Sequence, residues 1–177
     1  MFSYRKLYNI IVLFSETFYS RKVTRAKQSS LLLGHRNVYR NISDALTSVV
    51  EDLITNENAK TFMTGGMGEF DGQFAATVRG LQRKYPDIEL LLVKPYFSNE
   101  LNTNKEYYKI MYDDVVIPDA VAGAHPKSAI KKRNRWMVEN SDYIIGFVYR
   151  DFGGAYDAIK YAHKLGKQVF NLAENEK

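Results

Sequence analysis

The residues with the clearest chemical potential form one stretch, Met63–Asp71, with the sequence MTGGMGEFD. It follows a short β-type run and leads directly into an amphipathic helical pattern. Its glycines, Gly65, Gly66 and Gly68, permit a tight turn and let a ligand approach the main chain without a Cβ in the way. The helix that follows presents free N–H groups and the positive end of its dipole to the loop. The stretch therefore predicts a ligand-binding loop between a strand and a helix.

Two carboxylates, Glu69 and Asp71, stand in the first turn of that helix, where a simple phosphate cradle usually carries Lys or Ser. Carboxylates suit the helix dipole but repel a phosphate. We therefore expect them to face hydroxyl groups, a base or a reacting centre, which makes them the candidate catalytic residues. The alternative is that one of them only caps the helix.

Glycine-containing segments also follow other predicted strands. They are Gly34-His35-Arg36, residues 122–125 and residues 150–154. Ligands of open α/β sheets bind at the carboxyl ends of the strands, so these segments are expected near Met63–Asp71. The Gly153-Gly154 pair is the better phosphate site, because its next acid lies a turn further along. The alternatives are an ordinary tight turn at Gly153-Gly154 and a plain turn residue at His35.

Residues 131–135 (KKRNR) form a basic run, but helical geometry places its members on different faces of the predicted helix. At about 100° per residue, Ile130 and Met137 share one face, with Arg133 and Asn134 on either side of it. The Arg133 side chain should lean toward the helix N-terminus, where the ligand is expected. In the alternative interpretation its stem packs on the sheet and its guanidinium reaches solvent.

Composition limits the classes of protein that the chain can represent. Its 177 residues are 45% hydrophobic, enough for one domain with a core. The absence of cysteine excludes disulfides and thiolate metal sites and fits a cytoplasmic, reducing compartment. The three histidines lack zinc-ligand spacing, and no apolar run is long enough to span a membrane.

The net charge of +5 belongs to residues 1–28, where six basic residues face one acidic residue. The other 149 residues carry 19 basic and 19 acidic side chains, so no binding to nucleic acid is expected. Residues 1–28 are a basic N-terminal arm. Its apolar residues recur at helical spacing, so the arm is either a docked helix or a loosely packed extension.

Strand-type and helix-type patterns alternate over residues 29–177, which predicts a single α/β domain with a parallel sheet. The expected strands are 31–33, 60–63, 88–93, 114–117, 143–149 and 168–172. Helices are expected at 42–53 (capped by Asn41 or Ser43), 70–85, 102–111, 127–140 and 155–165.

The order of these motifs resembles the SLOG superfamily, in particular small uncharacterised bacterial members that begin near a Gly-His-Arg triplet. The motifs are Gly34-His35-Arg36, Thr64-Gly65-Gly66 with Asp71, the run from Arg133 to Met137, and Gly153-Gly154-Ala155. The resemblance implies a Rossmann-like three-layer fold and a site for a nucleotide-derived ligand. It differs from the LOG phosphoribohydrolases, because the Pro and Thr of their Pro-Gly-Gly-x-Gly-Thr loop are missing from residues 64–69.

The leading hypothesis is a protein that binds or senses a nucleotide-derived small molecule, without a further cofactor or metal; a homo-oligomer is compatible with it. The alternative is an N-glycosidase that releases a base from a nucleoside monophosphate. The expected ligand-binding residues are Gly34, His35, Arg36, Gly65, Gly66, Gly68, Glu69, Asp71, Arg133, Asn134, Gly153 and Gly154.

Overall fold

The computed structural model describes residues 29–34, 38 and 41–173. The N-terminal arm and the residues His35 and Arg36 lie outside this range. The strands are β1 (Ser29–Gly34), β2 (Thr61–Thr64), β3 (Glu89–Val93), β4 (Asp114–Val116), β5 (Tyr143–Phe147) and β6 (Gln168–Asn171). The helices are α2 (Ser43–Thr55), α3 (Glu69–Leu81), α4 (Asn99–Thr103), α5 (Lys105–Met111), α6 (Pro126–Glu139) and α7 (Gly154–Lys164), with a 3₁₀ turn at Asp119–Val121.

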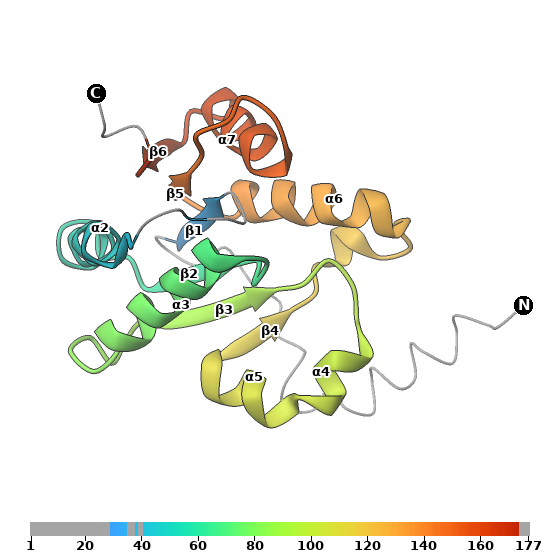
Figure 1. The fold of residues 1–177 in the computed structure, drawn as a ribbon, viewed down its shortest axis with the longest axis horizontal. Coiled ribbons are helices and arrows are strands. Elements are labelled where there is room, and N and C mark those ends of the chain that lie inside the picture. The colour runs from blue at the N-terminus through green and yellow to red at the C-terminus, as the bar shows by residue number, and fades with distance from the viewer. Residues whose placement is uncertain (1–28, 35–37, 39–40, 174–177) are drawn as a thin grey trace, which may run out of the picture.

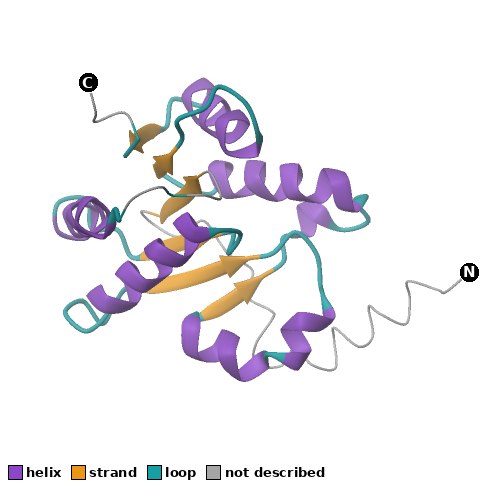
Figure 2. Ribbon diagram, viewed as in Figure 1, coloured by secondary structure: helices purple, strands orange, loops and turns teal. Residues whose placement is uncertain are grey.

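All six strands form one parallel sheet in the order β4-β3-β2-β1-β5-β6 (Figures 1 and 2). In the register, Leu31 lies beside Met63 on one side and Ile144 on the other. Leu31, Met63 and Ile144 are fully buried, as expected where helices cover both faces. The predicted Rossmann-like α/β fold with a parallel sheet is confirmed.

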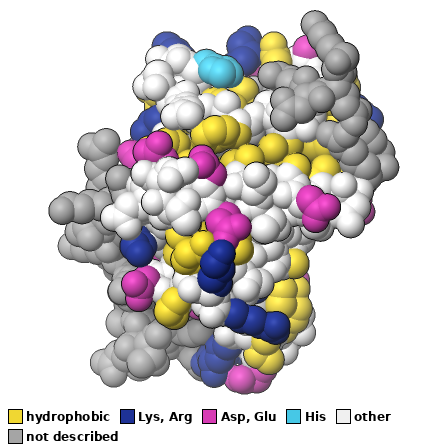
Figure 3. All heavy atoms as spheres, turned by 90° about the vertical axis from the view of Figure 1, so that its left-hand side faces the viewer, with side chains coloured by type: hydrophobic (Ala, Val, Ile, Leu, Met, Phe, Trp, Pro, Cys, Tyr) yellow, Lys and Arg dark blue, Asp and Glu magenta, His cyan; other side chains and the backbone are white. Residues whose placement is uncertain are grey.

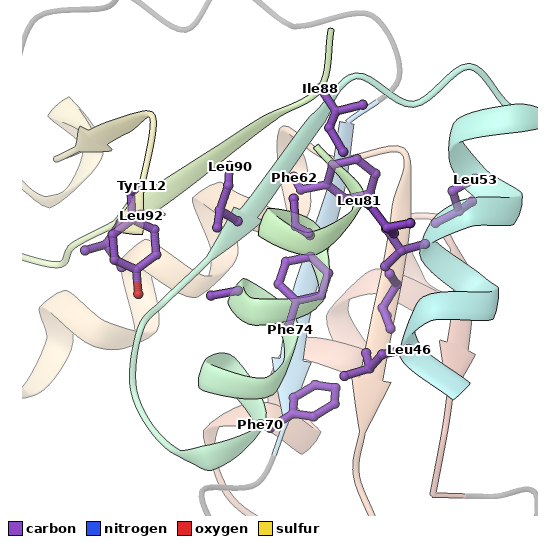
Figure 4. Packing of buried hydrophobic residues seen from close by; sticks show 14 of the residues in the cluster. Leu46, Leu53, Phe62, Phe70, Phe74, Leu81, Ile88, Leu90, Leu92 and Tyr112 are labelled. Atoms are coloured by element: carbon purple, nitrogen blue, oxygen red, sulfur yellow. The ribbon is translucent and has the colours of Figure 1, made fainter. Parts of the chain in front are cut away.

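Helices cover the sheet on both faces, and each face has its own core. Residues of α2 and α3 pack with the side chains of one face around Phe62, Phe74 and Leu90 (Figure 4). The Phe62 and Phe74 rings lie 6.1 Å apart between centroids. On the opposite face, α6 and α7 pack on Leu31 and Met63. The alternation of side chains along each strand supplies both cores.

The helical segment after β3 differs from the prediction of one helix at 102–111. It starts earlier and divides into α4 and α5 at Asn104, whose backbone lies outside the helical region (φ −111°, ψ 28°). Asn and Thr compete with the backbone for hydrogen bonds, and they are poor formers of helix interiors. The run of residues 102–104 (NTN) therefore breaks the helix.

Two other helix ends also differ from the prediction. Helix α3 ends at Leu81, and turns rather than helix lead to Pro86. The residue before a proline is disfavoured in helical conformation, which is consistent with Tyr85 lying outside the helix. At the start of α2, Ser43 lies inside the helix, and the Asn41 side chain accepts a hydrogen bond from the Ser43 N–H at 2.9 Å.

The strand order reverses between β1 and β5, because the chain moves outward from β1 in one direction and from β5 in the other. In open α/β sheets, such a switch point leaves a crevice at the carboxyl ends of the strands. Here the ends of β1 and β5 and the loop after β2 meet beside the N-terminal ends of α3 and α7 (Figure 1). The topology thus brings the predicted glycine segments to one edge of the sheet.

On the face of the molecule shown in Figure 3, acidic and basic side chains of the described residues are interspersed, and neither charge predominates. No helix among the described residues has the length and apolar character that a bilayer crossing needs. Within the same part of the chain, no three His, Cys, Asp or Glu side chains are grouped as metal ligands would be.

Candidate functional site

A cavity of about 250 Å³ opens at the switch point, and we call it the site cavity. Six of the predicted ligand-binding residues line it: Gly34, Gly65, Asp71, Arg133, Asn134 and Gly154. They come from the end of β1, the loop after β2, the first turn of α3, the middle of α6 and the start of α7. The topology therefore brings together residues that lie up to 120 positions apart in the sequence.

The Asp71 carboxylate holds the loop between β2 and α3 in place through hydrogen bonds. We call this loop, residues 65–68, the glycine loop. Asp71 Oδ1 accepts hydrogen bonds from the Thr64 hydroxyl (2.5 Å) and from the backbone N–H groups of Gly65 (3.1 Å) and Gly66 (3.2 Å). The residue is only 8% exposed. Buried donors need an acceptor, so this one carboxylate oxygen fixes the turn between β2 and α3.

Arg133 is the second buried polar residue of the site, at 3% exposed. Its Nη1 donates to the Val93 carbonyl oxygen at 2.7 Å, and its Nη2 lies 3.4 Å from the Met67 sulfur. Its Nε has no hydrogen-bond partner among the described residues. Burial lowers the pKa of Arg133, and the nearby charge of Asp71 opposes that shift. The guanidinium thus keeps unused donor capacity beside a cavity, rather than reaching solvent as the alternative interpretation held.

Gly65 is required because Arg133 lies directly against it. A Cβ at Gly65 would come within 2.2 Å of Arg133 Nη1. We predict that Gly65→Ala lowers the free energy of unfolding by roughly 1–3 kcal/mol, the usual cost of overpacking a tight site. Urea denaturation measures this.

The matched control is Gly72→Ala in α3, where a Cβ would have no heavy atom within 4 Å. In a helix interior this change should stabilise by about 0.5–1 kcal/mol. Equal effects of the two substitutions would contradict the close contact between Gly65 and Arg133.

Glu69, the other candidate acid, holds the connection between β1 and α2. Its Oε2 accepts a hydrogen bond from the Val38 backbone N–H at 3.1 Å. One turn later, Gln73 Oε1 accepts the Ile42 N–H at 3.2 Å. Glu69 is not among the residues that line the site cavity. Its position on α3 thus couples this helix to the segment that follows β1.

The remaining predicted residues that the structure describes are not among those that line the site cavity. Gly66 and Gly68 line a second cavity, which shares Met67 with the first. Gly153 precedes α7 with a positive φ of 98°, which favours glycine at this turn. The sequence reasoning missed the apolar lining of the site cavity by Leu33, Met67 and Ala155.

Solved structures identify the class of fold. The chain resembles DNA processing protein A (DprA) from Streptococcus pneumoniae with a TM-score of 0.60 and 19% identity over 81% of this chain. DprA from Helicobacter pylori, described for its single-stranded DNA binding mode, matches with a TM-score of 0.58 and 17% identity over 82% of this chain. The chain spans only 50% and 65% of these two proteins. The likeness establishes a shared Rossmann-like fold.

The family follows from the sequence. The chain belongs to the YspA SLOG family (YpsA), whose sequence model matches residues 34–170. It is also 28% identical over 148 residues to the uncharacterised SPbeta prophage-derived protein YoqJ of Bacillus subtilis (strain 168). That match covers 74% of this chain and 86% of YoqJ. The predicted membership of the SLOG superfamily is confirmed.

Proposed function

We propose that the protein binds a nucleotide or a nucleotide-derived small molecule in the site cavity. The observation that carries the proposal is the buried Arg133, which lines the cavity at the switch point and whose Nη2 lies against the Met67 sulfur. A thioether sulfur is a weak acceptor, so a phosphate or a base acceptor in the cavity would be a stronger partner for the guanidinium. The loop glycines and the start of α7 supply backbone donors of the kind that phosphates use.

The site cavity alone is small for a nucleotide, so a ligand of that size would have to extend beyond it. Ligand sites usually occupy about 300–1,000 Å³, and the site cavity has about 250 Å³. A groove of about 620 Å³ between α6 and α7 adjoins it and shares Ile130, Asn134 and Gly154. One part of the ligand would occupy the site cavity, and the other would follow the groove.

Binding without turnover agrees best with the contacts of the two acids. A general base must reach a proton or a water molecule of the reaction. Asp71 Oδ1 is already shared by three donors of the loop, and Glu69 Oε2 accepts the Val38 N–H. In the alternative, an N-glycosidase, these acids would engage the ribose or activate water while Arg133 and Gly153-Gly154 hold phosphate. Release of free base from AMP that is abolished by Glu69→Gln or Asp71→Asn would establish that alternative.

The binding proposal is tested by thermal unfolding in the presence of mono-, di- and cyclic nucleotides, NAD and ADP-ribose. A ligand at a hundred times its Kd stabilises the native state by about 2.7 kcal/mol. For a chain of this size, that free energy corresponds to a rise in Tm of roughly 5–10 °C. At least one compound should produce such a rise, and no rise across the panel would contradict the proposal.

The same thermal unfolding experiment is also carried out with a single-stranded oligonucleotide. The groove between α6 and α7 carries the basic residues Lys131, Arg135, Lys160 and Lys164 against the acidic Asp157. The equal numbers of acidic and basic residues outside the N-terminal arm favour a small molecule over nucleic acid. Stabilisation by the oligonucleotide alone would reverse that preference.

A further inference from the structure

A second cavity, of about 520 Å³, lies between the glycine loop and the segment that follows β3. The backbone of Gly66–Gly68 lines one part of it, and Lys94, Tyr96 and Glu100 line another. Met67 separates this cavity from the site cavity, since it lines both. The candidate site described above uses neither Lys94 nor Glu100. The second cavity is therefore a separate place where a polar ligand could bind.

Lys94 is the cation of the second cavity and forms no ion pair with the residues that the structure describes. It is half-buried, and its Nζ lies 5.5 Å from the centre of the Tyr108 ring. Among the described residues, no carboxylate comes within 4 Å of it. Burial lowers the pKa of Lys94, the charges of Glu100 and Asp71 raise it, and that of Arg133 lowers it. A partly desolvated ammonium that forms no ion pair is suited to bind an anion.

The glycine loop supplies backbone donors to the same cavity. The N–H groups of Met67 and Gly68 donate to no acceptor within the described part of the chain. The 13-residue helix α3 begins directly after Gly68, so the positive end of its dipole lies here too. The two acids of the first turn bond elsewhere, Asp71 to the loop itself and Glu69 to the Val38 N–H. An ammonium and two backbone N–H groups lining one cavity can then share the oxygens of a phosphate.

Glu100 gives the second cavity a hydroxyl acceptor. Its Oε1 accepts a hydrogen bond from the Tyr108 hydroxyl at 2.8 Å. A carboxylate accepts hydrogen bonds and donates none, so a ligand group beside it should be a hydroxyl rather than a second phosphate. The cavity thus offers donors for a phosphate and an acceptor for a hydroxyl group.

We propose that the second cavity binds a sugar phosphate, with the phosphate on Lys94 and the N–H groups of Met67 and Gly68, and a sugar hydroxyl on Glu100. This site is distinct from the nucleotide site, and the inference holds whatever fills the site cavity. It assigns the protein two ligand sites that share the glycine loop. Occupation of one site can then alter the other through Met67.

The test is a titration of the full-length, ¹⁵N-labelled protein with ribose 5-phosphate, followed by amide chemical shifts. The amide signals of Met67 and Gly68 should move in the wild type, whereas free ribose should leave them unchanged. In Lys94→Met the affinity should fall on the order of tenfold to a hundredfold, the loss of one charge-assisted hydrogen bond. The same variant should unfold at a higher temperature, because it no longer buries an ammonium.

The matched control is Lys132→Met, an exposed lysine of α6 that lines none of the cavities described above. It should bind ribose 5-phosphate as the wild type does. Unmoved Met67 and Gly68 signals in the wild type, or unchanged affinity in Lys94→Met, would overturn the proposal. If inorganic phosphate moved these signals at the same concentrations as ribose 5-phosphate, the role given to Glu100 and the sugar would be wrong. Should Lys94→Met not fold, the comparison of ribose 5-phosphate with ribose and phosphate in the wild type decides the matter.

Discussion

Replacing Arg133 by methionine is expected to weaken nucleotide binding on the order of tenfold to a hundredfold, since each hydrogen bond from a charged group contributes about 1.5–3 kcal/mol. The arginine is almost fully buried beside the site cavity and has an unpaired Nε. A ligand anion in the site cavity would gain a charge-assisted bond from the guanidinium, and methionine offers none. Calorimetric titration with the compound that stabilises the wild type measures the difference.

The stability of Arg133→Met is expected to stay close to that of the wild type. The variant loses the hydrogen bond to the Val93 carbonyl, but it no longer buries a charge. Replacing a buried ion by an apolar side chain of similar volume is often neutral or stabilising. We expect the free energy of unfolding to stay within about 2 kcal/mol of the wild type.

The control for this substitution is Arg135→Met, two positions along the same helix. The Arg135 guanidinium lies over the Tyr161 ring, 5.3 Å from its centre, and lines the groove rather than the site cavity. Its loss should reduce affinity less than the loss of Arg133. Equal affinities of wild type and Arg133→Met would show that Arg133 only supports the fold.

Asp71→Ala is expected to lower the free energy of unfolding by roughly 2–4 kcal/mol, because buried donors lose their acceptor. The substitution leaves the N–H groups of Gly65 and Gly66 and the Thr64 hydroxyl without the carboxylate oxygen that binds all three. Asp71→Asn should cost less, since its amide oxygen can still accept. Denaturant titration of both variants gives the values.

Asp44→Ala separates this loss from a simple effect on the helix dipole. Asp44 is an exposed acid in the first turn of α2, as Asp71 is a buried acid in the first turn of α3. Dipole effects at exposed positions amount to about 0.3–1 kcal/mol. If Asp71→Ala cost no more than Asp44→Ala, Asp71 would not be the organiser of the glycine loop.

The fold could be predicted from the sequence because its signals are local. Apolar runs such as residues 88–93 identify buried strands, and the periodicity from Phe70 to Leu81 identifies a covering helix. Helical geometry also placed Arg133 on the inward face of α6. The missed break at Asn104 falls where three weak helix formers follow one another.

The roles of the acids could not be predicted, because they depend on loop geometry and on distant segments. Asp71 was expected to face a ligand and lines the site cavity, but the sequence did not reveal that its Oδ1 bonds to the turn that precedes it. The partner of Glu69, Val38, lies 31 positions earlier in the chain. Lys94 was missed altogether, since its half-buried state depends on the packing of α5 and Tyr108 beside it. Such contacts arise only once the topology is formed.

The most direct measurement of the central claim is mass spectrometry of the small molecules that the natively purified protein releases on denaturation. The wild type should release a nucleotide or a nucleotide-derived compound in a fixed ratio to protein, and Arg133→Met, purified in parallel, should release much less. Release of the same compound in the same amount from both proteins, or of no such compound from the wild type, would contradict a nucleotide site at Arg133.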